Sequence, residues 1–201
     1  MKFTELSEIA KENARNARRY HEHYLQWGWW DSVYEDAVAV ASLLGISIDV
    51  GSRTSDRQIM FSGFSSQGDG ASFRGTYSFA PEAVQKVTER TGGNDVTLIA
   101  IATELTALQI AQRLAGRGYV AFKITTSGFY THSGTMSLEW YDFYGDDDLS
   151  DIAEDKFLAL MRRFADWIYK RLEQEYDYHM SDETLDELLA DEDFDEAGCV
   201  V

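Results

Sequence analysis

A glycine-flanked aspartate is the feature of this sequence closest to a catalytic or ligand-binding motif. Asp69 stands between Gly68 and Gly70, in a loop rich in serine and glycine. Glycines let a backbone approach a ligand closely, and a carboxylate can ligate a cation or act as a base. The fragment lacks the lysine of a phosphate-binding loop and the repeated oxygen ligands of a calcium loop. It also suits an ordinary turn that begins at Gln67, so both interpretations stay open.

The histidines and clustered aspartates do not follow a known metal-binding spacing. His21 and His23 lie two residues apart in an expected helix, so their side chains point to different faces. His132 and His179 stand outside any zinc motif. The three aspartates of residues 146–148 suit a helix start as well as a cation site, and we expect the helix start. We therefore predict no metal, no cofactor and a non-enzymatic protein.

The clearest chemical signal is the charge of the last third of the chain. The 201 residues carry a formal net charge of −17. Residues 142–201 hold 20 acids against 5 bases, whereas residues 1–141 hold 15 acids against 13 bases. Such a segment repels phosphate backbones, which argues against direct nucleic-acid binding, and it complements a basic protein. The acids expected to contact a partner are Asp182, Glu183, Asp186, Glu187, Asp191, Glu192, Asp193, Asp195 and Glu196.

Three tryptophans, Trp27, Trp29 and Trp30, follow the first expected helix. Such a cluster either docks a loop onto the core or forms an interaction hot spot, and we include it among the partner-binding residues. The helix before it, over residues 4–25, is the most basic part of the chain. Its arginines, between residues 15 and 19, form a solvated face, or they bind a partner or the acidic tail itself.

The periodicity of apolar residues predicts the elements that position these groups. Steps of three and four residues predict helices over 4–25, 33–44, 82–91 and 149–178, a short helix after Ser181, and one capped by Asn94 or Asp95 that ends before Gly116. The apolar stripe of this last helix is expected to comprise Leu98, Ile101, Ala102, Leu105, Leu108, Ile110, Ala111 and Leu114. Alternation at period two predicts strands over 46–50, 57–64, 71–79, 119–126 and 135–144.

These elements predict an α+β fold, with an antiparallel sheet of about five strands, helices packed on it and a long C-terminal helix. We expect Ile59–Tyr77 to be its central strand pair, with Phe73 and Tyr77 facing the core and Ser72 and Arg74 facing solvent. Residues 1–180 are expected to form one domain, and 181–201 an acidic C-terminal tail. Cys199 is the single cysteine, no stretch approaches the roughly 18 apolar residues of a membrane helix, and we predict a cytoplasmic protein.

Three stretches resemble a family of uncharacterised acidic proteins that bacteriophages and prophages carry. They are Trp29–Asp36 (WWDSVYED), Leu44–Ile48 (LGISI) and Phe61–Phe73 (FSGFSSQGDGASF), and the resemblance covers residues 27–80. Some members of the family are labelled as antitoxins of toxin–antitoxin systems. The resemblance implies a mobile-element origin and, with it, an inhibitor of a host machine such as a restriction or CRISPR nuclease, whose nucleic-acid groove is basic.

We therefore expect a non-enzymatic acidic binding protein that neutralises a basic host protein by imitating the charge of a nucleic acid. The expected partner is a nuclease-like or toxin-like protein. A homodimer is compatible with the sequence, and direct contact with nucleic acid or a membrane is not expected. Two alternatives stay open: an antitoxin that neutralises a toxin protein, and a small-ligand or divalent-metal-dependent enzyme that uses the loop of Gly68, Asp69 and Gly70.

Overall fold

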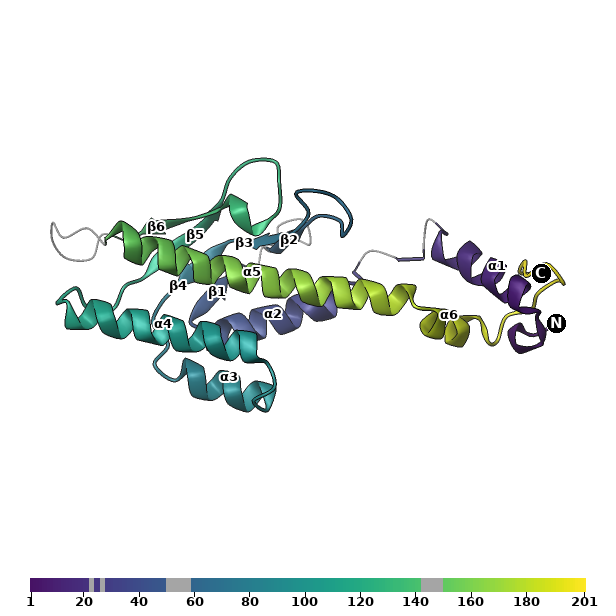
Figure 1. The fold of residues 1–201 in the computed structure, drawn as a ribbon, viewed down its shortest axis with the longest axis horizontal. Helices are drawn as coiled ribbons and strands as arrows, with labels where there is room; N and C mark the ends of the chain where they lie inside the picture. The colour runs from purple at the N-terminus through teal and green to yellow at the C-terminus, as the bar shows by residue number, and fades with distance from the viewer. Residues whose placement is uncertain (22–23, 26–27, 50–58, 142–149) are drawn as a thin grey trace. The chain divides into compact units, whose positions relative to one another are not determined.

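The computed structural model describes residues 1–21, 24–25, 28–49, 59–141 and 150–201 (Figure 1). Contacts within the chain divide it into two compact units, each described here by itself. We call Met1–Ser32 with Leu172–Val201 the acidic unit, and Val33–Arg171 the sheet unit. The described elements are η1 (Phe3–Glu5), α1 (Glu8–Arg19), α2 (Asp31–Leu43), β1 (Ile46–Ile48), β2 (Ile59–Phe61), β3 (Ala71–Phe73), β4 (Gly75–Tyr77), α3 (Ala83–Thr91), α4 (Val96–Leu114), β5 (Phe122–Thr126), η3 (Ser133–Thr135), β6 (Met136–Trp140), α5 (Asp151–Met180) and α6 (Asp182–Leu189).

The predicted α+β class and the long C-terminal helix are confirmed. β1, β4, β5 and β6 form a four-stranded antiparallel sheet in that order. One face of this sheet is buried, because Phe122 and Ile124 are 0% exposed. The other face meets solvent, where Lys123 of β5 pairs with Glu139 of β6 at 3.2 Å. This alternation is typical of a sheet with helices on one side only.

The predicted strand over residues 71–79 is in fact two strands, which correct the expected central strand pair. β3 pairs with β2 in a separate two-stranded sheet, whereas β4 pairs with β1 and β5. The exposed Arg74 stands between them. Ser72, expected to face solvent, is 1% exposed because all three residues of β3 are buried. Period two describes a half-buried strand, and β3 is covered on both faces.

Aromatic side chains join α5 to the sheets of the sheet unit. Phe157 of α5 packs its ring against Tyr77 and Phe122 at centroid distances of 6.0 and 5.6 Å. Two helical turns further along α5, Phe164 packs edge-on against Phe73 of β3 at a centroid distance of 5.5 Å. Each of these rings is almost completely buried. The face of α5 that carries Phe157 and Phe164 therefore packs against both sheets.

The second half of helix α4 buries a different face from the one predicted. Its first half follows the expected stripe, but Ile110 is 48% and Leu114 83% exposed, while Gln109 is 0% exposed. The Gln109 amide Nε2 donates to the Val120 carbonyl at 2.8 Å, and the Val120 N–H donates to Gln109 Oε1 at 2.9 Å. These two hydrogen bonds explain why the Gln109 amide is buried, and the spacing of apolar residues could not predict them.

The acidic unit has its own small apolar core, built from both ends of the chain. Its buried members are Phe3, Leu6, Ala10, Ala14, Leu189 and Phe194. Residues 181–201, expected as a tail, begin with helix α6 and end in a short antiparallel bridge between Phe194 and Val200. No helix within the described ranges is long and apolar enough to cross a membrane.

Candidate functional site

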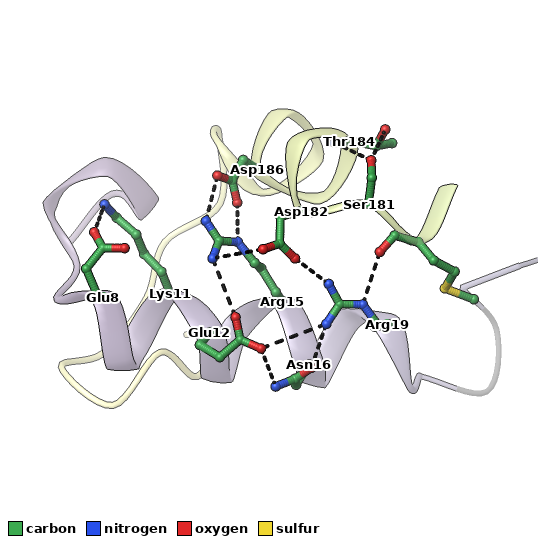
Figure 2. A network of polar contacts seen from close by, with 11 residues as sticks. Glu8, Lys11, Glu12, Arg15, Asn16, Arg19, Ser181, Asp182, Thr184 and Asp186 are labelled. Atoms are coloured by element: carbon green, nitrogen blue, oxygen red, sulfur yellow. Dashed lines mark hydrogen bonds and ion pairs between the residues drawn. The ribbon is translucent and has the colours of Figure 1, made fainter. Parts of the chain in front are cut away.

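An array of ion pairs joins the basic face of α1 to the acidic face of α6 (Figure 2). Ser7 and Ser181 cap these helices by accepting hydrogen bonds from Ala10 N–H and Thr184 N–H. Arg15 donates from Nε and NH2 to the two oxygens of Asp186 at 2.6 and 2.8 Å. The sequence left three roles open for the α1 arginines. Binding to residues 181–201, which we call the acidic segment, is the one seen.

Further cations of the N-terminal region pair with the acidic segment. Arg19 contacts Asp182 at 2.6 Å, and Arg18 contacts Glu192. Lys2 lies 3.0 Å from the Asp193 carboxylate, and the N-terminal amine donates to the Phe194 carbonyl at 2.8 Å. Four of the nine predicted partner-binding acids are therefore already paired with cations of the same unit.

The guanidinium of Arg15 is held in a strongly polar environment. Its side chain is only 13% exposed, and it also lies 3.7 Å from Asp182. The hydrogen bonds that Arg15 donates to Asp186 raise the pKa of Arg15 above its ordinary value, more than burial lowers it. Because a planar guanidinium matches a carboxylate at two points, this pair fixes the register of α1 on α6.

The other acids of the segment are on the surface without a cation beside them in the described part of the chain. Glu183 and Glu187 project from α6, and Asp191 and Glu196 follow it, all exposed. Asp195 has a structural role, because its Oδ1 accepts the N–H groups of Ala197 and Cys199, each at 2.9 Å. The predicted acidic residues thus separate into a paired set, one turn-capping residue and an exposed set.

The acidic unit keeps a large excess of negative charge after its internal ion pairs form. It holds 17 acids against 5 bases, a formal net charge of −12, while the sheet unit holds 18 against 13, a net of −5. Every base of this unit lies in its N-terminal part, and residues 172–201 contain none. The exposed carboxylates of Glu183, Glu187, Asp191 and Glu196 therefore have no compensating cation among the described residues.

The tryptophans lie in the same unit. Trp29 and Trp30 are half-buried and pack edge to face at 5.6 Å, and Trp29 also contacts Tyr176 and His179 of α5 at 6.0 and 6.5 Å. Both tryptophans take part in internal contacts, which favours the docking interpretation for these two. Trp27 lies outside the described residues, as do His23 and the aspartates of residues 146–148.

Asp69 holds its own loop together. Its Oδ2 accepts the N–H groups of Ser65 and Ser66 at 3.0 and 2.6 Å, and its own N–H donates to the Ser66 carbonyl at 3.1 Å. A carboxylate that accepts local backbone N–H groups is the side-chain mimic of a turn. This geometry fits the turn interpretation of Gly68, Asp69 and Gly70.

The loop of Asp69 lies against a second loop that the sequence did not connect with it. A Cβ on Gly70 would come within 2.7 Å of His132 Cβ, and one on Gly68 would lie 3.8 Å from the Tyr130 ring. His132 itself is a structural residue, since its Nδ1 accepts the Gly134 N–H at 3.1 Å. Beside them Phe129 is fully exposed. No group of three histidine, cysteine or acidic residues capable of holding a metal occurs among the described residues.

A family model described as a domain of unknown function, DUF8835, matches residues 29–182. No curated protein and no solved structure matches the chain. The matched segment contains the whole sheet unit, whereas α1 and most of the acidic segment lie outside it.

Proposed function

The chain belongs to the DUF8835 family, whose function is unknown, and from its own residues we propose a non-enzymatic binding protein that occupies a basic groove of a partner protein through its acidic unit. The observation that carries this proposal is the net charge of −12 on a folded unit in which the carboxylates of Glu183, Glu187, Asp191 and Glu196 are exposed and have no cation beside them among the described residues. A folded acidic surface presents its charges at fixed spacing, which an unfolded tail does not.

The internal α1–α6 contact indicates how such a surface recognises cations. Arg15 and Arg19 are one helical turn apart on α1, and they contact Asp186 and Asp182, which are one turn apart on α6. Carboxylates at this spacing therefore suit arginine side chains on a helix or in a groove. The partner class that we propose is a protein with a nucleic-acid groove, because such grooves carry arginines and lysines.

The identity of the partner follows the origin expected from sequence. A phage or mobile-element protein of this kind would inhibit a host defence nuclease, and an antitoxin would neutralise a toxin by the same electrostatic contact. Both belong to one binding mode. The enzyme alternative has less support, because the Asp69 carboxylate accepts two backbone N–H groups of its own loop.

Point substitutions test the proposal more sharply than removal of the acidic segment. A deletion of residues 181–201 would remove Leu189 and Phe194 from the core of the unit. We therefore combine Glu183→Gln, Glu187→Gln and Glu196→Gln, three exposed acids of the acidic segment. The matched control neutralises Glu35, Asp155 and Asp166, three exposed acids of the sheet unit, and has the same net charge.

The measurement is capture from host lysate on each immobilised variant, followed by mass spectrometry and by an activity assay of the captured protein. We expect wild type and control to retain a basic nucleic-acid-handling protein at low salt and to inhibit it. The triple variant in the acidic segment should retain at least tenfold less, and binding should weaken as salt rises. Equal retention by the two triple variants would overturn the proposal.

A further inference from the structure

Helix α4 has an apolar face on the surface of the sheet unit. Figure 1 shows this helix flanked by α3 and α5, and Glu104 of α4 pairs with Arg163 of α5 at 2.7 Å. At 100° per residue, one uncharged stripe runs along its full length within roughly a third of the circumference. The stripe consists of Val96, Ile99, Ala100, Thr103, Ala107, Ile110 and Leu114.

Three of the four larger side chains of this stripe are exposed, and the fourth, Ile99, is half-buried. Val96, Ile110 and Leu114 are 75%, 48% and 83% exposed, and Thr103 and Ala107 are exposed as well. The Thr103 hydroxyl donates to the Ile99 carbonyl at 2.8 Å, so its hydrogen bond is made within the helix. A helix that is apolar on two opposite faces is typical of one covered on both sides.

The other helices of the sheet unit turn charged residues to solvent. On α3 the exposed positions include Lys86 and Glu89, and on α5 they include Asp155 and Asp166. The stripe on α4 lacks a single charge in a chain where 26% of residues are charged. Exposed apolar area of this shape marks a contact surface, and we propose that it is the interface of a homodimer.

The size pattern along the stripe fits a second copy of the same helix. In an antiparallel pair whose two-fold axis crosses the stripe at the height of residue 105, Val96 of one copy faces Leu114 of the other. In the same register Ala100 faces Ile110, and Thr103 faces Ala107. Large side chains then meet small ones near the axis, which is the self-complementarity that an isologous interface requires.

The area of the stripe sets the expected affinity. A 19-residue helix is about 28 Å long and about 10 Å wide, so the two stripes cover roughly 600 Å² together. Stable interfaces bury about 1,200 Å² or more, so α4 alone supports a weak, reversible dimer. A groove of about 370 Å³ lies beside the stripe toward α5, and its lining is mixed: Ala107, Leu108, Ala159 and Leu160 are apolar, and Glu104, Lys156 and Arg163 are charged.

This inference is independent of the proposed partner binding and has the opposite salt dependence. Each chain carries a net charge of −17, so two copies repel one another, and added salt should strengthen their association. Binding of the acidic unit to a basic protein should weaken with salt. Failure of one proposal therefore leaves the other unaffected.

Sedimentation equilibrium of the full chain, over about 5 to 500 µM protein, tests the dimer. We expect a dissociation constant on the order of 10–100 µM. Ile110→Lys should weaken it at least tenfold. The control is Leu188→Lys in α6, because Leu188 is 47% exposed and Ile110 48%, and it should leave association unchanged. A wild type that stays monomeric throughout, or equal effects of both substitutions, would overturn the proposal.

A mixing experiment tests the register. Position 100 of one copy faces position 110 of the other, so Ile110→Glu and Ala100→Lys place opposite charges together only in the mixed dimer. We expect each variant to be monomeric alone and the equimolar mixture to recover association to within about threefold of wild type. A mixture that stays monomeric would refute the antiparallel arrangement.

Discussion

Arg15 of α1 and Asp186 of α6 are 171 residues apart in the chain and form a two-point ion pair, with distances of 2.6 and 2.8 Å. The Arg15 side chain is 13% exposed, so water and salt screen this pair less than the ion pairs at the rim of the contact. Both the N-terminal and the C-terminal segments of the acidic unit are held by this contact. Its strength therefore decides whether the exposed acids keep their positions.

We predict that Arg15→Ala destabilises the acidic unit by about 1–3 kcal/mol, because it removes two charge-assisted hydrogen bonds and leaves the Asp186 carboxylate without them. Arg15→Lys should be intermediate, since an ammonium keeps the charge and loses the two-point geometry. Amide hydrogen exchange in α6 measures the effect. Lys11→Ala, which breaks a pair with the 82% exposed carboxylate of Glu8 within α1, is the control and should change exchange little.

Local pattern predicted the elements of this fold, and tertiary contacts decided the exceptions. The helices and strands follow the period of their apolar residues, so most were found within a few positions. Ser72 is buried because β3 is covered on both of its faces. Gln109 is buried because its amide pairs with the backbone of Val120. The periodicity of one helix or strand does not indicate which other elements pack against it. The same limit explains why the α1–α6 pairing was one open alternative and why the loop of His132 was not connected with Asp69.

Asp69→Ala should lower the free energy of unfolding of the sheet unit by about 1–2 kcal/mol, because the N–H groups of Ser65 and Ser66 lose their acceptor. Asp69→Asn keeps one acceptor oxygen and should cost less. Urea denaturation measures both values. We also expect no thermal stabilisation of wild type by Mg²⁺, Ca²⁺ or nucleotides. A cation that raises the melting temperature of wild type and not of Asp69→Asn would contradict this prediction.

Gly70→Ala should separate the two loops of the sheet unit. The added Cβ would lie 2.7 Å from His132 Cβ and 3.0 Å from His132 Cα, and a backbone atom has little room to move. We expect a loss of about 1–3 kcal/mol in stability. Gly63→Ala in the same loop is the control, because its nearest neighbour is Asp69 Oδ2 at 3.4 Å. Equal losses in the two variants would show that the loops are not in close contact.

Tyr77 makes the sheet unit sensitive to alkaline pH. Burial raises the pKa of its phenol to about 12. Between about pH 10 and 12 the unfolded chain loses this proton while the folded chain retains it, so stability falls as pH rises, by up to about 2.7 kcal/mol over the window. Tyr77→Phe removes this titration. Its unfolding free energy should decline less than that of wild type between pH 9 and pH 12 in urea titrations.

Gln109 decides which face of α4 enters the core, and its replacement tests that assignment. Gln109→Leu keeps the volume of the side chain and makes it apolar, as periodicity favours for a core position. It leaves the N–H and carbonyl of Val120 without the partners that Gln109 provides. We expect a loss of about 1–3 kcal/mol, because two part-buried backbone groups lose their partners and the leucine returns part of this cost by apolar burial. Gln112→Leu, one turn later, is the comparison. Gln112 is 6% exposed, and within the described residues its amide oxygen accepts one long bond, from Arg117 at 3.4 Å, so its replacement should cost less than about 1 kcal/mol. If Gln109→Leu were as stable as wild type in urea denaturation, the amide would not be what turns Ile110 and Leu114 to the surface.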